Sequence, residues 1–140
     1  MRDFTILAPI FALAAWTTAI LVLTAARRLM SGVSPKEFAL GESQKVPSAV
    51  SLPNRNYMNL LELPVLFYII CILAFVTQTA SGIVIQLAWA YVALRVVHSL
   101  IHVTYNAVLH RFVAFALSNG VLVALWVVVG SAIFSRQGAV

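Results

Sequence analysis

The sequence predicts an all-α integral membrane protein, a four-helix transmembrane bundle in a single domain over residues 1–140. Two observations predict this class. First, 62% of the 140 residues are hydrophobic and only 9% are charged, against roughly 25% charged residues in soluble domains. Second, the charges are segregated, because residues 4–26, 63–94 and 112–135 contain none. About 20 apolar residues are enough for a helix to cross the roughly 30 Å hydrocarbon core of a bilayer.

The first and last uncharged stretches each predict one span, at residues 4–27 and 111–135. The middle stretch predicts two, at residues 57–78 and 82–108, because the small and polar residues 78–82 between them are typical of a tight turn. The first stretch is expected to be a retained helix, since its apolar run is longer than the 7–15 residues of a cleaved signal.

Residues 28–56 form the one sizeable segment predicted to lie outside the membrane. Pro35, Gly41, Pro47 and Pro53 punctuate it, so we expect no long helix there. A connection of this length suggests a lid, a docking loop or disorder.

The distribution of Lys and Arg predicts the orientation, since cytoplasmic loops carry an excess of both. One side of the membrane has Arg2 and Arg136. The other side has Arg27, Arg28, Lys36, Lys45, Arg55 and Arg111. The 28–56 loop is therefore expected in the cytoplasm and both termini outside. The net charge of +5 is interpreted as a consequence of this topology and of anionic lipid headgroups. No basic and aromatic interleaving indicates nucleic-acid binding.

Polar residues within the predicted second span lie at helical spacing. Arg55, Asn59 and Glu62 are four and three residues apart, which predicts one helical face. Ionisable groups inside a membrane helix are costly, about 2.5–3.5 kcal/mol for Arg at the centre on insertion scales. Such groups normally face a bundle interior, a water-filled cavity or a partner.

The third span carries a second polar stripe, formed by Arg95, His98, His102 and Tyr105. One interpretation is structural: Arg95 and Glu62 form a buried ion pair that fixes helix register. The other is a binding site near the cytoplasmic surface. Arginines bind carboxylates in a bidentate manner and stabilise thiolates, so the two stripes would suit a small zwitterionic thiol.

Metal and haem sites are less well supported by the pattern. His98 and His102 are a plausible metal pair, but a haem held by two histidines needs them on opposing helices, and no metal ligand set is predicted. The lone Cys71 falls inside the second span and is interpreted as a small buried apolar residue.

These residues resemble the MAPEG superfamily, the membrane-associated proteins of eicosanoid and glutathione metabolism. The resemblance covers nearly the whole chain. It is carried by Arg27-Arg28 with the following Val33-Ser34-Pro35, by the stretch from Arg55 through Asn59 and Glu62 to Pro64, and by Arg95-x-x-His98 with Arg111 thirteen residues after His98. The third-span spacing is similar to the microsomal glutathione transferase branch.

The resemblance implies a homotrimer that binds glutathione between subunits near the cytoplasmic face. Arg55, Asn59 and Glu62 would hold the tripeptide, and Arg27 or Arg28 would reach one of its carboxylates from the adjacent subunit. Arg111 would stabilise the thiolate. The implied activity is transfer of glutathione to a lipophilic electrophile, or reduction of a peroxide, with a hydrophobic substrate that enters from the lipid bilayer.

Two departures from the family pattern bear on that activity. Leu63 and His102 stand where related proteins carry tyrosines, so two hydroxyl donors are lost, although Tyr105 is one turn from His102. Two alternatives therefore stay open. One is a non-catalytic membrane protein of the same fold that binds a small thiol or lipid. The other is an ion or proton pathway through His98, His102 and Glu62.

Overall fold

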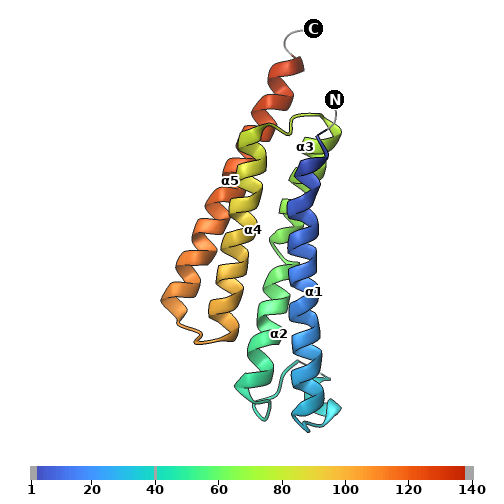
Figure 1. Cartoon of the computed structure of the whole chain (residues 1–140). Helices are drawn as coiled ribbons and strands as arrows, with labels where there is room; N and C mark the ends of the chain where they lie inside the picture. The colour runs from blue at the N-terminus through green and yellow to red at the C-terminus, as the bar shows by residue number, and fades with distance from the viewer. Residues whose placement is uncertain (1–2, 40, 138–140) are drawn as a thin grey trace.

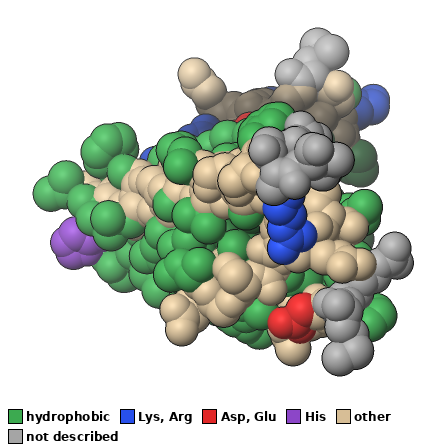
Figure 2. Space-filling view, turned by 90° about the horizontal axis from the view of Figure 1, so that it is seen from above, with side chains coloured by type: hydrophobic (Ala, Val, Ile, Leu, Met, Phe, Trp, Pro, Cys, Tyr) green, Lys and Arg blue, Asp and Glu red, His purple; other side chains and the backbone are tan. Residues whose placement is uncertain are grey.

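The computed structural model describes residues 3–39 and 41–137, so Arg2 lies outside the described residues. Four helical segments in this part are long and apolar enough to cross a bilayer: Phe4–Met30, Ser48–Val76, Gly82–Val103 and Val108–Arg136. The predicted all-α, four-span membrane bundle is therefore confirmed. Seen from the end that carries the termini, hydrophobic side chains cover much of the bundle (Figure 2).

The helices form a compact up-and-down arrangement (Figure 1). A short 3-10 turn, η1 (Phe4–Ile6), leads into α1 (Leu7–Met30). Helix α1 packs along α2 (Ser48–Leu61) and α3 (Pro64–Val76), while α4 (Gly82–Val103) packs along α5 (Val108–Gln137). Both termini lie at one end of the bundle, and the α1–α2 connection and the α4–α5 turn lie at the other (Figure 1).

The apolar core fills the space among α1, α3, α4 and α5. Phe67 and Tyr91 are fully buried and their rings stack with centroids 4.6 Å apart. Leu13 from α1 and Leu125 from α5 are buried around them. Because α3 and α4 are locked together here, the polar residues nearer the α4–α5 turn are held at a fixed depth.

The segment between the first two spans is shorter than residues 28–56. Helix α1 continues to Met30 and ends at Ser31-Gly32, where Gly32 adopts a positive φ of 66°, as is common after a helix C-terminus. Helix α2 begins at Ser48, directly after Pro47. Pro53 lies inside α2, in its second turn, where it removes the backbone hydrogen bond to the carbonyl of Ala49.

The third span is shorter than residues 82–108. Helix α4 ends at Val103, and Asn106 in the following turn has a positive φ of 47°, a conformation that a continuing helix does not allow. Helix α5 starts at Val108. Tyr105 therefore lies in the turn rather than on the helical face that carries Arg95.

A candidate glutathione site at one end of the bundle

The second span breaks at Glu62, the last residue of its predicted polar stripe. Arg55 and Asn59 belong to α2, whereas Glu62 is its C-terminal cap, with φ −84° and ψ −100°. The proline ring of Pro64 would clash with the carbonyl one turn earlier, which explains why the helix cannot continue. Arg55 and Glu62 are exposed and Asn59 is half-buried, so all three reach the surface of the bundle.

The predicted polar stripe on α4 differs from the stripe on α2, because its residues within the helix lie inside the bundle. Arg95, His98 and His102 are only 0%, 3% and 2% exposed. The guanidinium carbon of Arg95 lies 5.6 Å from the ring centroid of Phe115 and 6.0 Å from that of Tyr91. Such distances allow cation–π attraction in a site from which water is excluded.

Arg95 makes its hydrogen bond with the backbone of the broken helix. Its Nη2 donates to the carbonyl oxygen of Asn59. The two ion pairs within the described residues are Arg28–Glu42 and Lys45–Glu37, so the expected pair between Arg95 and Glu62 is not formed. Helix register at this level is fixed by a bond from a side chain to a carbonyl.

The histidines connect α4 to the start of α5. His98 Nδ1 lies 3.0 Å from the carbonyl oxygen of Arg111, and the rings of His98 and His102 meet edge to face with centroids 5.9 Å apart. His98 Nε2, both ring nitrogens of His102, and Nε and Nη1 of Arg95 are buried without a hydrogen-bond partner among the described residues. The two unpartnered nitrogens of Arg95 are donors, whereas a neutral histidine ring has one donor and one acceptor nitrogen, so the interior of the site offers hydrogen-bonding groups of both kinds.

A pocket of about 240 Å³ brings residues of both stripes together near the α4–α5 turn. It is lined by Asn59, His98, Val108, Arg111, Phe112 and Phe115. Arg111 is half-buried, and its Nη1 donates to Asn106 Oδ1 at 2.8 Å, which orients the guanidinium beside the pocket. The lining therefore combines polar side chains with aromatic and apolar ones.

Tyr105 does not join this pocket. It is 61% exposed, and its hydroxyl lies 3.2 Å from Nδ1 of His110, at the start of α5. The compensation that Tyr105 would provide for the tyrosine missing at His102 is not observed within this chain.

Arg27 and Arg28 lie at the same end of the bundle but outside the pocket. Arg28 forms the ion pair with Glu42 at 3.9 Å and lies 4.8 Å from the ring centroid of Phe38. Arg27 is exposed and lines a surface depression with Pro47. Within one subunit, then, neither arginine meets Asn59 or Arg111.

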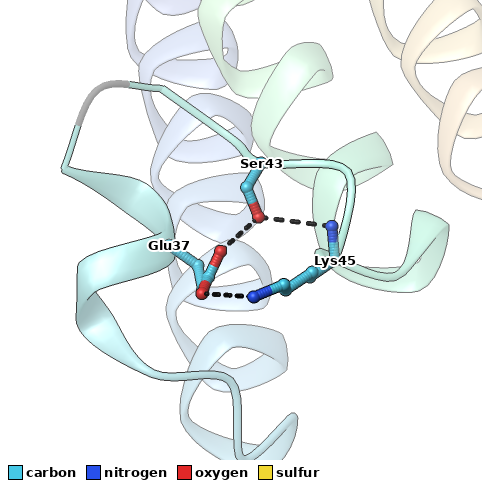
Figure 3. A network of polar contacts seen from close by, with 3 residues as sticks. All are labelled: Glu37, Ser43 and Lys45. Carbon is cyan, nitrogen blue, oxygen red and sulfur yellow. Dashed lines mark hydrogen bonds and ion pairs between the residues drawn. The ribbon is translucent and has the colours of Figure 1, made fainter.

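The connection after α1 is organised by a polar network (Figure 3). Ser43 Oγ donates to Glu37 Oε2 at 2.6 Å and accepts from the backbone N–H of Lys45 at 3.2 Å. Lys45 Nζ lies 3.5 Å from Glu37 Oε1. The sequence suggests a lid, a docking loop or disorder for this segment. The contacts among its described residues argue against disorder.

One buried polar contact was not predicted. Asn56 Nδ2 donates to Ser99 Oγ, joining α2 to α4, and both residues are fully buried. The sequence predicts a second span that starts at residue 57, which leaves Asn56 in the loop. Helix α2 instead begins at Ser48 and therefore includes Asn56.

Metal binding finds no support from this arrangement. Among the residues that the structure describes, no three His, Cys, Asp or Glu side chains gather closely enough to hold a metal ion. Cys71 is buried in the apolar core.

The fold and the pocket together define a four-span integral membrane protein with a polar, arginine-containing site at one end of the bundle. The MAPEG family model matches residues 6–131. The chain therefore belongs to the MAPEG family and is a membrane protein of the superfamily of eicosanoid and glutathione metabolism. No curated protein and no solved structure matches it.

Proposed function

We propose that the protein is a membrane-bound glutathione-dependent transferase or peroxidase that acts on a lipophilic electrophile, most similar to the microsomal glutathione transferase branch. The observation that carries this proposal is the shared pocket of Asn59, His98 and Arg111, which faces Phe112 and Phe115. A thiol needs a cationic neighbour to react as thiolate, and a lipophilic partner needs an apolar wall beside it.

The residues divide the work of binding according to their chemistry. Arg55 would bind a carboxylate of glutathione, while Asn59 offers both a donor and an acceptor to its amides. Glu62 would accept hydrogen bonds from the ammonium group. Arg111 would stabilise the thiolate after the thiol proton is lost to solvent. The thiolate would then attack the electrophilic carbon, forming the new C–S bond as the bond to a leaving group such as halide breaks.

A homotrimer would complete this site. Glu62 is exposed on the surface of one subunit although it belongs to a membrane span, and a carboxylate facing hydrocarbon is costly. A neighbouring subunit packed on this face would shield Glu62 and could bring its own Arg27 or Arg28 to the same ligand. The end of the bundle that carries the pocket and the α1–α2 connection is proposed to face the cytoplasm. Both termini are then proposed to lie on the opposite side of the membrane.

The test is titration calorimetry with glutathione on the protein in nanodiscs, repeated for Arg55→Ala and Glu62→Gln. Arg136→Ala, at the opposite end of the bundle, is the control. Binding that is lost in the first two variants and kept in the control supports the site. A folded wild type that binds no glutathione refutes it.

A second candidate is a non-catalytic binding protein of the same fold. The observation in its favour is that His102 is 2% exposed within α4, while Tyr105, the next tyrosine along the chain, is 61% exposed and its hydroxyl lies beside His110. Turnover with a generic electrophile, such as an activated aryl halide, distinguishes the two functions. Saturable glutathione binding without any conjugate formed would favour the binding protein.

A further inference from the structure

We propose that Arg95 is a positioning residue, whose guanidinium caps the C-terminal end of α2 and holds the break that presents Asn59 and Glu62 to the ligand. Sequence spacing assigned Arg95 to the glutathione-contacting residues. The structure instead connects it to the backbone of the element that carries them. The effect on glutathione rests on the proposed function, whereas the capping itself does not.

The break creates a need that Arg95 meets. In a continuous helix the N–H of Leu63 would donate to the carbonyl of Asn59, and the N–H of residue 64 would donate to that of Leu60. Pro64 has no N–H, and the Val65 and Leu66 amides bond to the nearer carbonyls of Glu62 and Leu63, at 3.1 and 3.0 Å. Carbonyls left without partners in a bilayer are costly.

Arg95 supplies the missing donor from a neighbouring helix. Its Nη2 donates to the Asn59 carbonyl, and the positive charge lies at the C-terminal end of α2, where the helix dipole favours a cation. Complete burial and the flanking rings of Tyr91 and Phe115 leave the guanidinium little freedom to move to another partner.

The consequence for the site is geometric. Helix α2 stops at Leu61, so Glu62 leaves the helical path and becomes exposed, while the Asn59 side chain stays in the pocket beside His98 and Arg111. Without the hydrogen bond from Arg95, the junction between α2 and α3 would sample other backbone conformations. Arg95 would thus influence glutathione affinity without contacting glutathione.

The first experiment measures amide hydrogen exchange across residues 59–67 of the full-length protein in nanodiscs. Arg95→Met should accelerate this exchange about threefold to twentyfold, the range that corresponds to one hydrogen bond between membrane helices. Arg95→Lys should restore part of the protection, because it keeps a donor. The matched control is Arg136→Met, which removes an arginine bond of 3.1 Å to the carbonyl of Thr77 at the exposed end of α3. This control variant should leave the rate of amide exchange across residues 59–67 unchanged.

Pro64→Ala makes the experiment decisive. Alanine restores an N–H and removes the ring clash, so α2 and α3 can join and the Asn59 carbonyl can accept from Leu63. In that background Arg95→Met should change exchange across 59–67 by less than about twofold, because the cap is then redundant. Equal acceleration in both backgrounds overturns the capping role.

Glutathione affinity in the same four proteins separates positioning from direct contact. If Arg95 positions the site, Arg95→Met weakens binding when Pro64 is present and has little further effect when it is replaced. If Arg95 touches the ligand, it weakens binding by the same factor in both backgrounds, and the proposal fails. Should the wild type bind no glutathione, the proposed function fails, and the exchange cycle still decides the capping role.

Discussion

The buried contact between Asn56 and Ser99 gives a sharp test of how α2 is held against α4. Asn56 Nδ2 donates to Ser99 Oγ across two spans, and both residues are 0% exposed. Hydrogen bonds between membrane helices average about 0.6 kcal/mol and reach about 1.7 kcal/mol in double-mutant cycles. Because neither group can turn to water, we expect a coupling free energy in the upper half of that range.

The assay is a double-mutant cycle of Asn56→Ala and Ser99→Ala, with the free energy of unfolding measured by steric trapping in bicelles. Ser118→Ala is the matched control, since Ser118 is also buried but its hydroxyl bonds at 2.8 Å to Phe115 in its own helix. It should be additive with Asn56→Ala within about 0.5 kcal/mol. If Asn56 and Ser99 are equally additive, the inference that this bond joins the two helices is wrong.

Three further predictions concern separate parts of the chain. Arg111→Ala should spare glutathione binding but abolish the ultraviolet absorbance of the bound thiolate, and an unchanged thiolate signal would refute its role. Hydrogen bonds from the Thr5 side chain and backbone hold the pKa of Asp3 below its ordinary 3.8; the cap they form should therefore persist above that pH and be lost as the pH falls through the lowered pKa. The Thr5 amide resonance should report this loss, and Asp3→Asn should show no such transition. Ser43→Ala should accelerate hydrogen exchange around Glu37 while changing the free energy of unfolding by less than about 1 kcal/mol, because exposed polar contacts contribute little; no change in exchange would mean that Ser43 does not organise this connection.

Hydropathy was sufficient to predict the spans. The positions of the prolines were a poorer guide to where helices begin and break. Pro53 predicts an interruption of any helix in its segment, yet it lies in the second turn of α2 and the helix continues through it. Pro64 was expected to lie within one continuous span, and it instead divides α2 from α3. The effect of a proline depends on which carbonyls can find other donors, and those donors come from elsewhere in the chain.

The candidate site shows a similar division. Helical spacing identified Arg95 and Glu62 as members of two polar stripes, and an ion pair between them was one interpretation. In the structure Arg95 is buried and donates to a backbone carbonyl, while Glu62 is exposed. A periodic pattern shows which residues share a face. It does not show which face is turned inward, nor that a helix break will release an acceptor.

The unequal lengths of the helices have a consequence for how the protein sits in its bilayer. The first span has 27 residues and α4 has 22, so at 1.5 Å per residue they are about 40 and 33 Å long. Both begin near the end that carries the termini, and the α4–α5 turn stops short of the α1–α2 end (Figure 1). A span whose hydrophobic length differs from the bilayer thickness is accommodated by tilting or by local thinning of the bilayer.

If the bundle is placed in a bilayer in this way, the α4–α5 turn forms a rim close to the acyl chains. The longer α1–α2 side then projects among the headgroups. Phe112, which is 63% exposed and also lines the pocket with Arg111, stands at that rim. Under the proposed function, a lipophilic electrophile would reach the thiol sideways from the hydrocarbon, and glutathione would enter from the aqueous phase at the same end of the bundle. The step between the two sides would then separate the two reactants by the phase in which each one travels.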